Sequence, residues 1–322
     1  MPDVIKTKTE TVVDAIAPPE ADAAAVSAAG HKEQGKPRSL WGDAWYDLRH
    51  RPMFWISSIL LLLLLIVAAF PGMFTSVDPR SGDLTNHFLT KPALGHILQP
   101  DWFGYDGQGR SIYARVVYGT RASILVGVGV TALVTLLGGL LGMLAGYFGG
   151  WLDSIISRIT DIFFGIPFLL GAMVVLNAFT ERKVYVVILA LAFLGWTSIC
   201  RVMRSSVITA KQADYVTAAR ALGAGTPRIL FRHVLPNALA PTIVVATIAL
   251  GGYISAEATL SFLGLGLADP TISWGIDIAQ GSKDIRDNPH ALFFPAGALS
   301  LTVFAFIMLG DAVRDALDPK LR

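Results

Sequence analysis

The chain has 322 residues, of which 53% are hydrophobic and only 16% are charged, whereas soluble domains usually carry about 25% charged residues. The formal net charge of +2 comes without any interleaved basic and aromatic patch, so we expect no nucleic-acid partner. Cys200 is the only cysteine, which excludes an intrachain disulfide and a multi-cysteine metal site. We expect it to be a packing residue.

Residues 1–37 are rich in Ala, Glu, Lys and Pro and hold too little apolar surface to offset the entropy of ordering. We predict a disordered cytoplasmic tail, and no apolar stretch before Met53 resembles a signal peptide. Residues 30–37, G-H-K-E-Q-G-K-P, fall one residue short of a phosphate-binding loop. Pro37 replaces the hydroxyl residue that would hold magnesium, so we expect no nucleotide site here.

Residues 38–52 predict a short amphipathic helix. Trp41, Trp45 and Leu48 stand at i, i+4 and i+7 and form one apolar stripe flanked by charged residues. Such a helix is typical of the membrane interface. The alternative is a plain cytoplasmic lead-in with scattered aromatic residues.

Six apolar runs free of Asp, Glu, Lys and Arg dominate the rest of the chain. A bilayer core about 30 Å thick needs roughly 20 helical residues, and buried helices of a soluble core would keep a polar face. Residues 53–322 therefore predict an all-α membrane domain of six transmembrane helices. The runs are Met53–Phe70, Ala122–Leu152, Ile162–Thr180, Val184–Cys200, His233–Ala256 and Ala291–Gly310.

Basic residues set the predicted orientation. The loop 201–236 holds six basic residues against one acid, Asp214, and is therefore placed in the cytoplasm. Both termini then lie inside, and the long polar loops Pro71–Arg121 and Leu263–His290 lie outside. Asp161 is expected at the cytoplasmic end of the third span, where Arg158 could pair with it at i, i+3.

Helix breakers occur inside the apolar runs. The glycines of residues 138–146, G-G-L-L-G-M-L-A-G, would let helices approach closely. Pro167 and Pro295 could kink their spans and act as moving parts, but we favour ordinary packing for all of them.

Residues 213–237 predict a cytoplasmic helix–turn–helix. Asp214 is a good N-cap for a first helix that ends at Gly223. Thr226 would cap a second helix with Pro227 at its first position, ending near Pro236. The alanines of the first helix leave a smooth surface suited to docking in a groove of another protein.

This segment resembles the cytoplasmic signature of the integral subunits of ATP-binding-cassette importers, E-A-A-x-x-x-G followed at a fixed distance by I-x-L-P. Here the two parts read T-A-A-R-A-L-G and H-V-L-P, so that Thr217 replaces the usual Glu and His233 the usual Ile. Without the Glu, a required ion pair at position 217 is in doubt. The resemblance implies an ATPase-docking loop made of Thr217, Ala218, Ala219, Gly223, Ala224, Gly225, Leu235 and Pro236.

Three further stretches are similar to permeases of dipeptide, oligopeptide and nickel importers, and the resemblance covers Trp41–Arg322. They are residues 103–127, the pair A-E-A-T-L-S-F-L-G-L-G-L and P-T-I-S-W-G, and the ending G-D-A-V-R-D-A-L-D-P-K-L-R. They resemble the second, C-type permease of such systems. The resemblance implies a type I importer permease fold in the cytoplasmic membrane of a bacterium.

What the family resemblance implies is passage of a solute rather than catalysis. The expected partners are a homologous second permease, two ATPase subunits, an extracytoplasmic solute-binding protein and membrane lipid. ATP and magnesium would be bound by the ATPase subunits, so no cofactor or metal is expected in this chain. The solute would be a di- or oligopeptide, with nickel chelates or another small solute as the alternative.

Glu257 is the only acid between Asp214 and Asp269, near the outer end of the fifth span. An ionisable group at membrane depth is a functional candidate. It is either a pore or gate residue or, as we favour, an interfacial hydrogen-bonding residue. An ion-coupled transporter should show inverted repeats and buried acids in broken helices, and a membrane enzyme should show convergent catalytic groups. We find neither pattern.

Overall fold

The apolar runs fold as helices in the computed structural model, which describes residues 40–317. The tail predicted for residues 1–37 lies outside the described residues. Helix α2 (Leu40–Arg49) falls within the predicted segment 38–52, and its location at a membrane surface stays a prediction. Residues from Ala44 onward belong to one compact unit, to which the following description refers.

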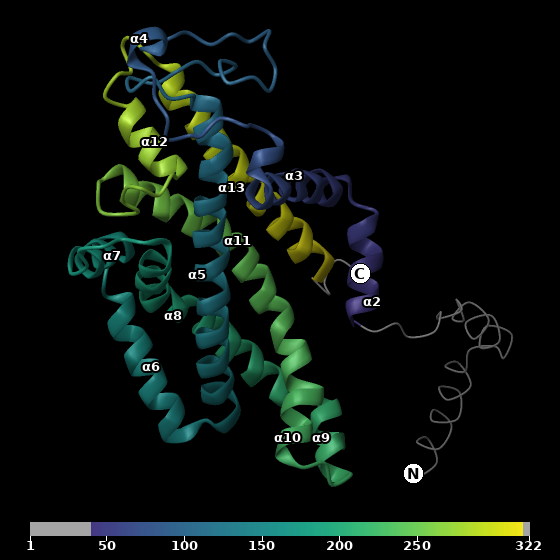
Figure 1. Cartoon of the computed structure of the whole chain (residues 1–322). Coiled ribbons are helices and arrows are strands. Elements are labelled where there is room, and N and C mark those ends of the chain that lie inside the picture. The colour runs from purple at the N-terminus through teal and green to yellow at the C-terminus, as the bar shows by residue number, and fades with distance from the viewer. Residues whose placement is uncertain (1–39, 318–322) are drawn as a thin grey trace, which may run out of the picture. The chain divides into compact units, whose positions relative to one another are not determined.

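Five helices are long and apolar enough to cross a membrane, with α11 counted together with the turns that lead into it. They are α3 (Pro52–Ala69), α5 (Ile112–Phe148), α8 (Val184–Lys211), α11 (Leu235–Phe262) and α13 (His290–Leu317). The sixth predicted span is a bent pair, α6 (Gly150–Phe164) and α7 (Phe168–Asn177). The all-α membrane fold is thus confirmed, with six spans when the bent pair counts as one (Figure 1).

The third span differs from the single helix predicted over Ile162–Thr180, and Pro167, which was named as a possible kink, lies at the break. Helices α6 and α7 meet at an angle of 86° across Gly165–Pro167. Pro167 lacks an N–H group and its ring clashes with the carbonyl four residues earlier, so a helix cannot run through it undisturbed. Span three also starts earlier than predicted, because Gly149 alone separates α5 from α6. Gly149 and Gly150 have φ values of 68° and 61°, which allow this sharp turn.

Two predicted loops, Pro71–Arg121 and 201–236, are shorter in the structure, because α5 and α8 extend into them. Helix α5 begins at Ile112 rather than near Ala122, because the Ser111 hydroxyl accepts a hydrogen bond from the Ala114 N–H and caps it. Helix α8 continues past Arg201 to Lys211, so the cytoplasmic loop 201–236 is largely helical. The observed bounds of α5 and α8 depend on local backbone structure and capping. The predicted bounds marked only the positions in the sequence where charged residues begin.

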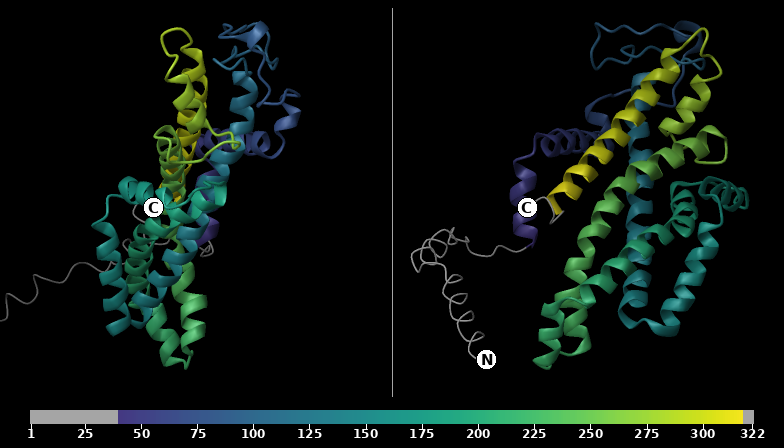
Figure 2. Two further views of the ribbon diagram at one scale, coloured as in Figure 1. Left: turned by 60° about the vertical axis from the view of Figure 1, so that its left-hand side comes forward. Right: turned by 180° about the vertical axis from the view of Figure 1, so that it is seen from behind.

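Helices α5 and α8 form the most intimate contact of the described unit (Figure 2). Gly138, Gly142 and Gly146 stand one turn apart on α5, and a Cβ added at any of them would overlap a backbone oxygen of α8. Small residues at this spacing allow two backbones to meet closely within a membrane. Cys200 is buried in the same contact, as the packing role predicted.

Two ion pairs fasten α6 to the cytoplasmic half of α8. Arg204 Nη2 donates to Asp153 Oδ2 at 2.7 Å. Arg201 Nη2 lies 3.3 Å from Asp161 Oδ1, so the ion-pair partner of Asp161 is Arg201 rather than the predicted Arg158.

The outer side carries the short helices η1 (Pro71–Met73), α4 (Leu84–His87) and α12 (Trp274–Gly281). Helix α12 packs on α13 and α11, and Trp274 is fully buried in a cluster with Ile254 and Phe306. The sequence analysis described this region only as a loop, because its helix is too short to show a period.

The close contact between α5 and α8 predicts that neighbouring glycines of α5 differ sharply in their tolerance of an added Cβ. Gly142→Ala should lower the stability of the folded subunit by about 1–3 kcal/mol, since overpacking displaces the α8 backbone. Gly139→Ala should be neutral or slightly stabilising, because its Cβ would meet only Met203 Cε at 3.6 Å and alanine favours helix over glycine. Thermal unfolding of the detergent-purified variants measures both; equal midpoints would contradict the account.

The orientation predicts which exposed side chains meet the outer solvent. In a Cys200→Ser background, Lys283→Cys should react with an impermeant thiol reagent in intact cells. Gln212→Cys should react only after the membrane is permeabilised. Both positions are exposed in the fold. Labelling of the Gln212 variant from outside would refute the inside placement of the termini.

Candidate functional site: a cytoplasmic helix pair and an outer polar cluster

The predicted cytoplasmic segment forms two short helices, α9 (Asp214–Ala221) and α10 (Thr226–Ile229). They lie at the opposite end of the unit from α4 and α12 in both figures (Figures 1 and 2). Val216 of α9 and Ile229 of α10 are buried against the ends of α5, α8 and α11, which fixes both helices to the membrane domain.

The first helix begins one residue earlier than predicted. Ala213 is its N-cap residue, and Asp214 is already helical and makes no cap hydrogen bond. Burial of Val216 sets this register, and its N–H donates to Ala213 O at 3.0 Å. Thr217 is therefore the fourth helical residue, so a Glu there would miss the capping-box position.

Gly223 ends α9 as predicted. Its φ is +80°, in the left-handed region that favours glycine. The Gly223 N–H donates to Arg220 O at 2.9 Å, and the Ala224 N–H donates to Ala219 O at 3.0 Å. These two bonds form a Schellman motif. No heavy atom lies within 4 Å of a Cβ built at this position, so a larger residue would meet backbone strain but no clash.

The second helix differs from the prediction at both ends. Gly225 rather than Thr226 is its N-cap, and the helix does not stop near Pro236. It passes through a wider turn, η2 (Leu230–Val234), directly into α11. Pro236 cannot donate the normal helical bond, and a π-type turn is one way in which a helix accommodates that loss. The segment thus joins span five as one continuous rod.

The predicted docking residues fall into two groups. Thr217, Ala218, Gly223 and Gly225 are exposed, whereas the remaining ones are half-buried: Ala219, Ala224, Leu235 and Pro236. Leu235 and Pro236 belong to the base of α11. The exposed four can contact a partner directly, and the others hold the pair in place.

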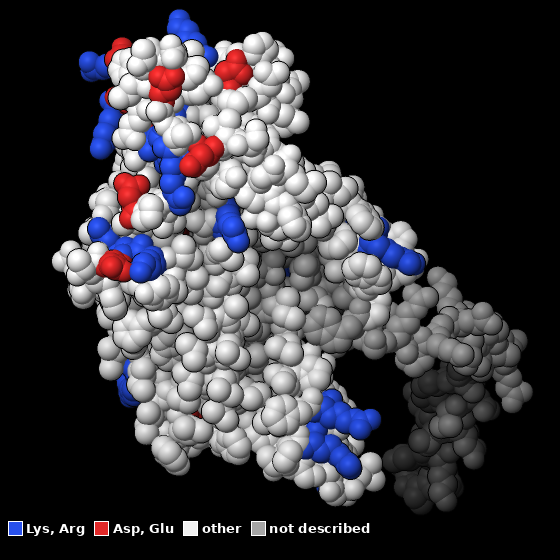
Figure 3. Space-filling model, in the orientation of Figure 1, with Lys and Arg blue, Asp and Glu red and all other residues white. Residues whose placement is uncertain are grey.

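The two most exposed large apolar side chains of residues 213–237 were not among the predicted docking residues. Leu222 is 89% exposed and Phe231 60% exposed. They lie among the exposed Arg220, Arg228 and Arg232, and the blue groups at the α9–α10 end stand out in Figure 3. Exposed apolar residues rimmed by charge are typical of a protein interaction site.

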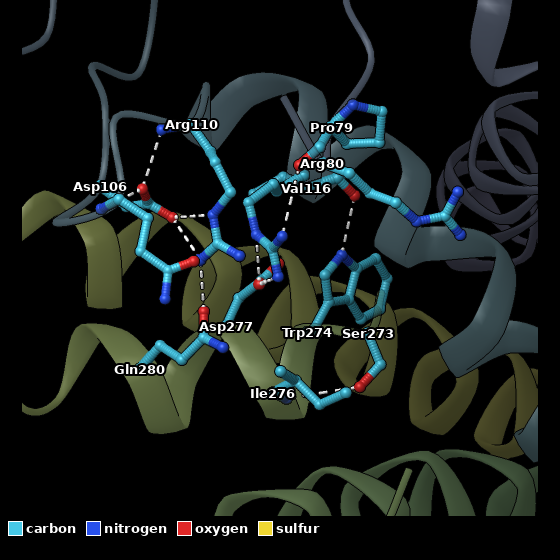
Figure 4. Close-up of polar contacts among 12 residues, drawn as sticks. Pro79, Arg80, Asp106, Arg110, Val116, Ser273, Trp274, Ile276, Asp277 and Gln280 are labelled. Carbon is cyan, nitrogen blue, oxygen red and sulfur yellow. Dashed lines mark hydrogen bonds and ion pairs between the residues drawn. The ribbon is translucent and has the colours of Figure 1, made fainter. Parts of the chain in front are cut away.

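A second polar arrangement ties the outer loops to the helices (Figure 4). Arg115 of α5 donates from Nε to Asp277 Oδ1 of α12 at 2.7 Å, and its Nη2 donates to the same oxygen. Its Nη1 reaches Pro79 O at 3.3 Å. Both side chains are buried. Burial raises the pKa of the Asp277 carboxyl, and the Arg115 guanidinium acts in the opposite direction.

Arg110 extends this cluster. Its Nε donates to Asp106 Oδ2 at 2.8 Å, and its Nη2 donates to Gln280 Oε1 at 2.6 Å. Trp274, the first residue of α12, donates from Nε1 to Val116 O at 3.0 Å. The Trp274–Val116 bond joins the stretches 103–127 and 270–275, which were noted as separate motifs. The bonds of Arg115 and Arg110 join the first stretch to Asp277 and Gln280, farther along α12. These pairings were not predicted.

Glu257 is completely buried on α11. Ser261 and Ser123 donate to its carboxyl oxygens at 2.8 and 3.2 Å. Ser123 in turn accepts from the Trp274 N–H at 3.4 Å, which connects α11, α5 and α12. This geometry is the one expected if Glu257 is a hydrogen-bonding residue between helices rather than a pore or gate residue. In the described part of the chain, no group of three or more His, Cys, Asp or Glu is placed to hold a metal.

The buried ion pair predicts a large stability effect. Asp277→Ala should destabilise the subunit by about 3–5 kcal/mol, because Arg115 would be left as an uncompensated buried charge. Glu181→Ala is the control: its pair with Lys183 is exposed, so its loss should leave the unfolding midpoint almost unchanged. Thermal unfolding compares the two. A control that proved as costly as Asp277→Ala would refute this ranking.

Comparisons with known proteins agree with the geometry. Residues 138–322 match the family described as binding-protein-dependent transport system inner membrane component. Residues 39–92 match the N-terminal TM domain of oligopeptide transport permease C.

Individual relatives cover nearly the whole chain. The oligopeptide transport system permease protein OppC of Bacillus subtilis is 37% identical over 93% of this chain and 96% of its own length. The glutathione transport system permease protein GsiD of Escherichia coli O157:H7 is 36% identical over 88% and 92%. A solved amino acid ABC transporter matches with a TM-score of 0.46 and 13% identity, over 65% of this chain and 93% of its own length.

Proposed function

Because the chain belongs to the family of binding-protein-dependent transport system inner membrane components, we propose that it is one permease subunit of an ATP-driven importer of peptides. Two relatives that it matches along most of their length are named for oligopeptide and glutathione transport. Peptides are therefore the solute class that these relatives support. An extracytoplasmic binding protein would choose among them and deliver them to the outer loops.

One observation carries the proposal: the exposed α9–α10 pair is continuous with span five. A partner ATPase that receives Leu222 and the smooth face of α9 in a groove would move α10 and α11 together. ATP is then a ligand with different affinities for two conformations, and the pair transmits that bias to the membrane helices. The chain itself performs no catalysis, and ATP and magnesium are held by its partners.

We propose that the functional complex contains this chain, a homologous second permease and two ATPase subunits. Each permease would supply half of the path. The arginines around the α9–α10 pair would complement acidic groups beside the ATPase groove, which favours docking in one register.

Substitutions in the docking surface should separate assembly from passage. Gly223→Asp forces a residue with a Cβ into the left-handed region, at a cost of about 1–2 kcal/mol, and distorts the α9 end. Ala218→Trp leaves this chain's packing intact, because Ala218 is exposed, but fills the space that a partner groove needs. Both should reach the membrane, bind ATPase subunits weakly and lose transport-coupled ATP hydrolysis.

Thr217→Ala is the control for this pair. Its side chain is exposed and is not at a capping position, so ATPase binding should stay near that of the unmodified protein. Co-purification of the ATPase subunits, together with peptide uptake into membrane vesicles, measures all three variants. Undiminished ATPase binding by Gly223→Asp and Ala218→Trp would refute the proposal that α9 docks on the ATPase subunit.

A further inference from the structure

An outer cavity of about 260 Å³ lies between the loop that precedes α5 and helix α12. The arginine and carboxylate cluster of Figure 4 forms part of its wall. Its volume suits one side chain or a small molecule rather than a whole peptide. The charged residues that line it are divided equally between acids and bases: Asp106, Asp277, Asp284, Arg110, Arg115 and Lys283.

The two arginines of this wall are occupied by carboxylates of the same chain. Arg110 Nε donates to Asp106 Oδ2 at 2.8 Å, and Arg115 Nε donates to Asp277 Oδ1 at 2.7 Å. Asp106 Oδ1 accepts from the N–H groups of Gln108 and Arg110, both at 2.9 Å. The charges of both arginines and of Asp106 are therefore balanced inside the wall.

Two carboxylates at the cavity keep acceptor capacity. Asp277 is 7% exposed, and no described group donates to its Oδ2 atom. No hydrogen bond or ion pair within the described part of the chain reaches the carboxylate of Asp284. Asp284 Oδ2 lies 2.8 Å from a Cβ built on Gly107, so it covers that glycine at the cavity wall. A buried acceptor without a donor costs free energy, which a ligand with donors would recover.

A ligand that satisfies both carboxylates must carry a positive charge and hydrogen-bond donors. An alkylammonium group carries a positive charge and three donors, and its hydrogen bonds to carboxylates are charge-assisted. A metal ion lacks a ligand set, since no group of three or more His, Cys, Asp or Glu among the described residues is placed to hold one. Lys283 opposes a cation, but it is exposed, and solvent and salt screen its charge.

We infer that this outer cavity is a binding site for an alkylammonium group. The group would enter beside Asp284 and donate to it and to Asp277 Oδ2. A free amine and a lysine side chain of a protein on the outer face both carry this group. The inference goes beyond the proposed function and does not depend on it.

The first experiment uses n-butylammonium chloride as the probe and the full chain purified in detergent. A ligand that binds only the folded state raises the unfolding midpoint as its concentration increases. n-Butylammonium should raise the midpoint. n-Butyltrimethylammonium carries the same charge without an N–H donor and should not raise it at equal concentration. No rise with n-butylammonium, or equal rises with both salts, would overturn the inference.

Variants of the wall identify the residues that bind the probe. Asp284→Asn keeps the shape of the side chain and removes its charge, so the Kd of n-butylammonium should rise at least about tenfold. Lys283→Gln removes a repelling charge and should lower the Kd. Asp287→Asn is the matched control, because Asp287 is an exposed acid nearby that does not line the cavity. Equal Kd values for Asp284→Asn and Asp287→Asn would overturn the inference.

Gly107→Ala keeps the test decisive if Asp284→Asn does not fold. Its Cβ would meet Asp284 Oδ2 at 2.8 Å and displace the flexible carboxylate, so it should also weaken n-butylammonium binding. Undiminished binding in a folded Gly107→Ala would count against the site.

The source of the ammonium group is found with the full complex and its extracytoplasmic binding protein. If a lysine of that protein enters the cavity, n-butylammonium should compete with its docking and Asp284→Asn should weaken the docking. Undiminished docking in both cases, with the probe still bound by the unmodified chain, assigns the site to a free amine. A binding protein that does not dock on the unmodified complex would refute the proposed delivery step and leave the ammonium site standing.

Discussion

The close approach of α5 and α8 is the contact on which the other features depend. It exists because Gly142 and its neighbours one turn away leave room for the α8 backbone. With α5 and α8 joined along one face, the ion pair between Asp153 and Arg204 fastens α6 beside them. Helix α7, after the bend, then packs against α8 and α11.

The two ends of the unit are connected through α11. Its cytoplasmic base continues into α10 without a break, and near its outer end Glu257 bonds to Ser123 of α5. Trp274 adds α12 to the same network, and the Arg115–Asp277 pair holds α12 to the start of α5. A displacement of the α9–α10 pair therefore acts on a continuous helix that reaches the polar network at the outer end.

The sequence predicted much of this architecture, because lipid demands long apolar helices and Gly223 has a specific backbone role that the structure confirms. It predicted a wrong bound where charge was used in place of caps, as at Arg201 within α8, and it chose the wrong cap at Asp214, because Ala213 is the N-cap. It missed the Arg115–Asp277 pair because the two residues stand 162 positions apart. No local period in the sequence indicates such a contact; only the folded chain brings Arg115 and Asp277 together.

We propose that the exposed end of α9 is where an ATPase subunit contacts this chain and changes its conformation. The direct measurement is disulfide cross-linking in membranes, with Leu222→Cys in a Cys200→Ser background and single cysteines placed along the groove of the ATPase subunit. Leu222 is 89% exposed, so its replacement should leave the fold intact. We expect cross-links from Leu222→Cys whose yield changes when ATP is added, and none from Lys283→Cys. ATPase cross-links at Lys283→Cys but not at Leu222→Cys would contradict the account.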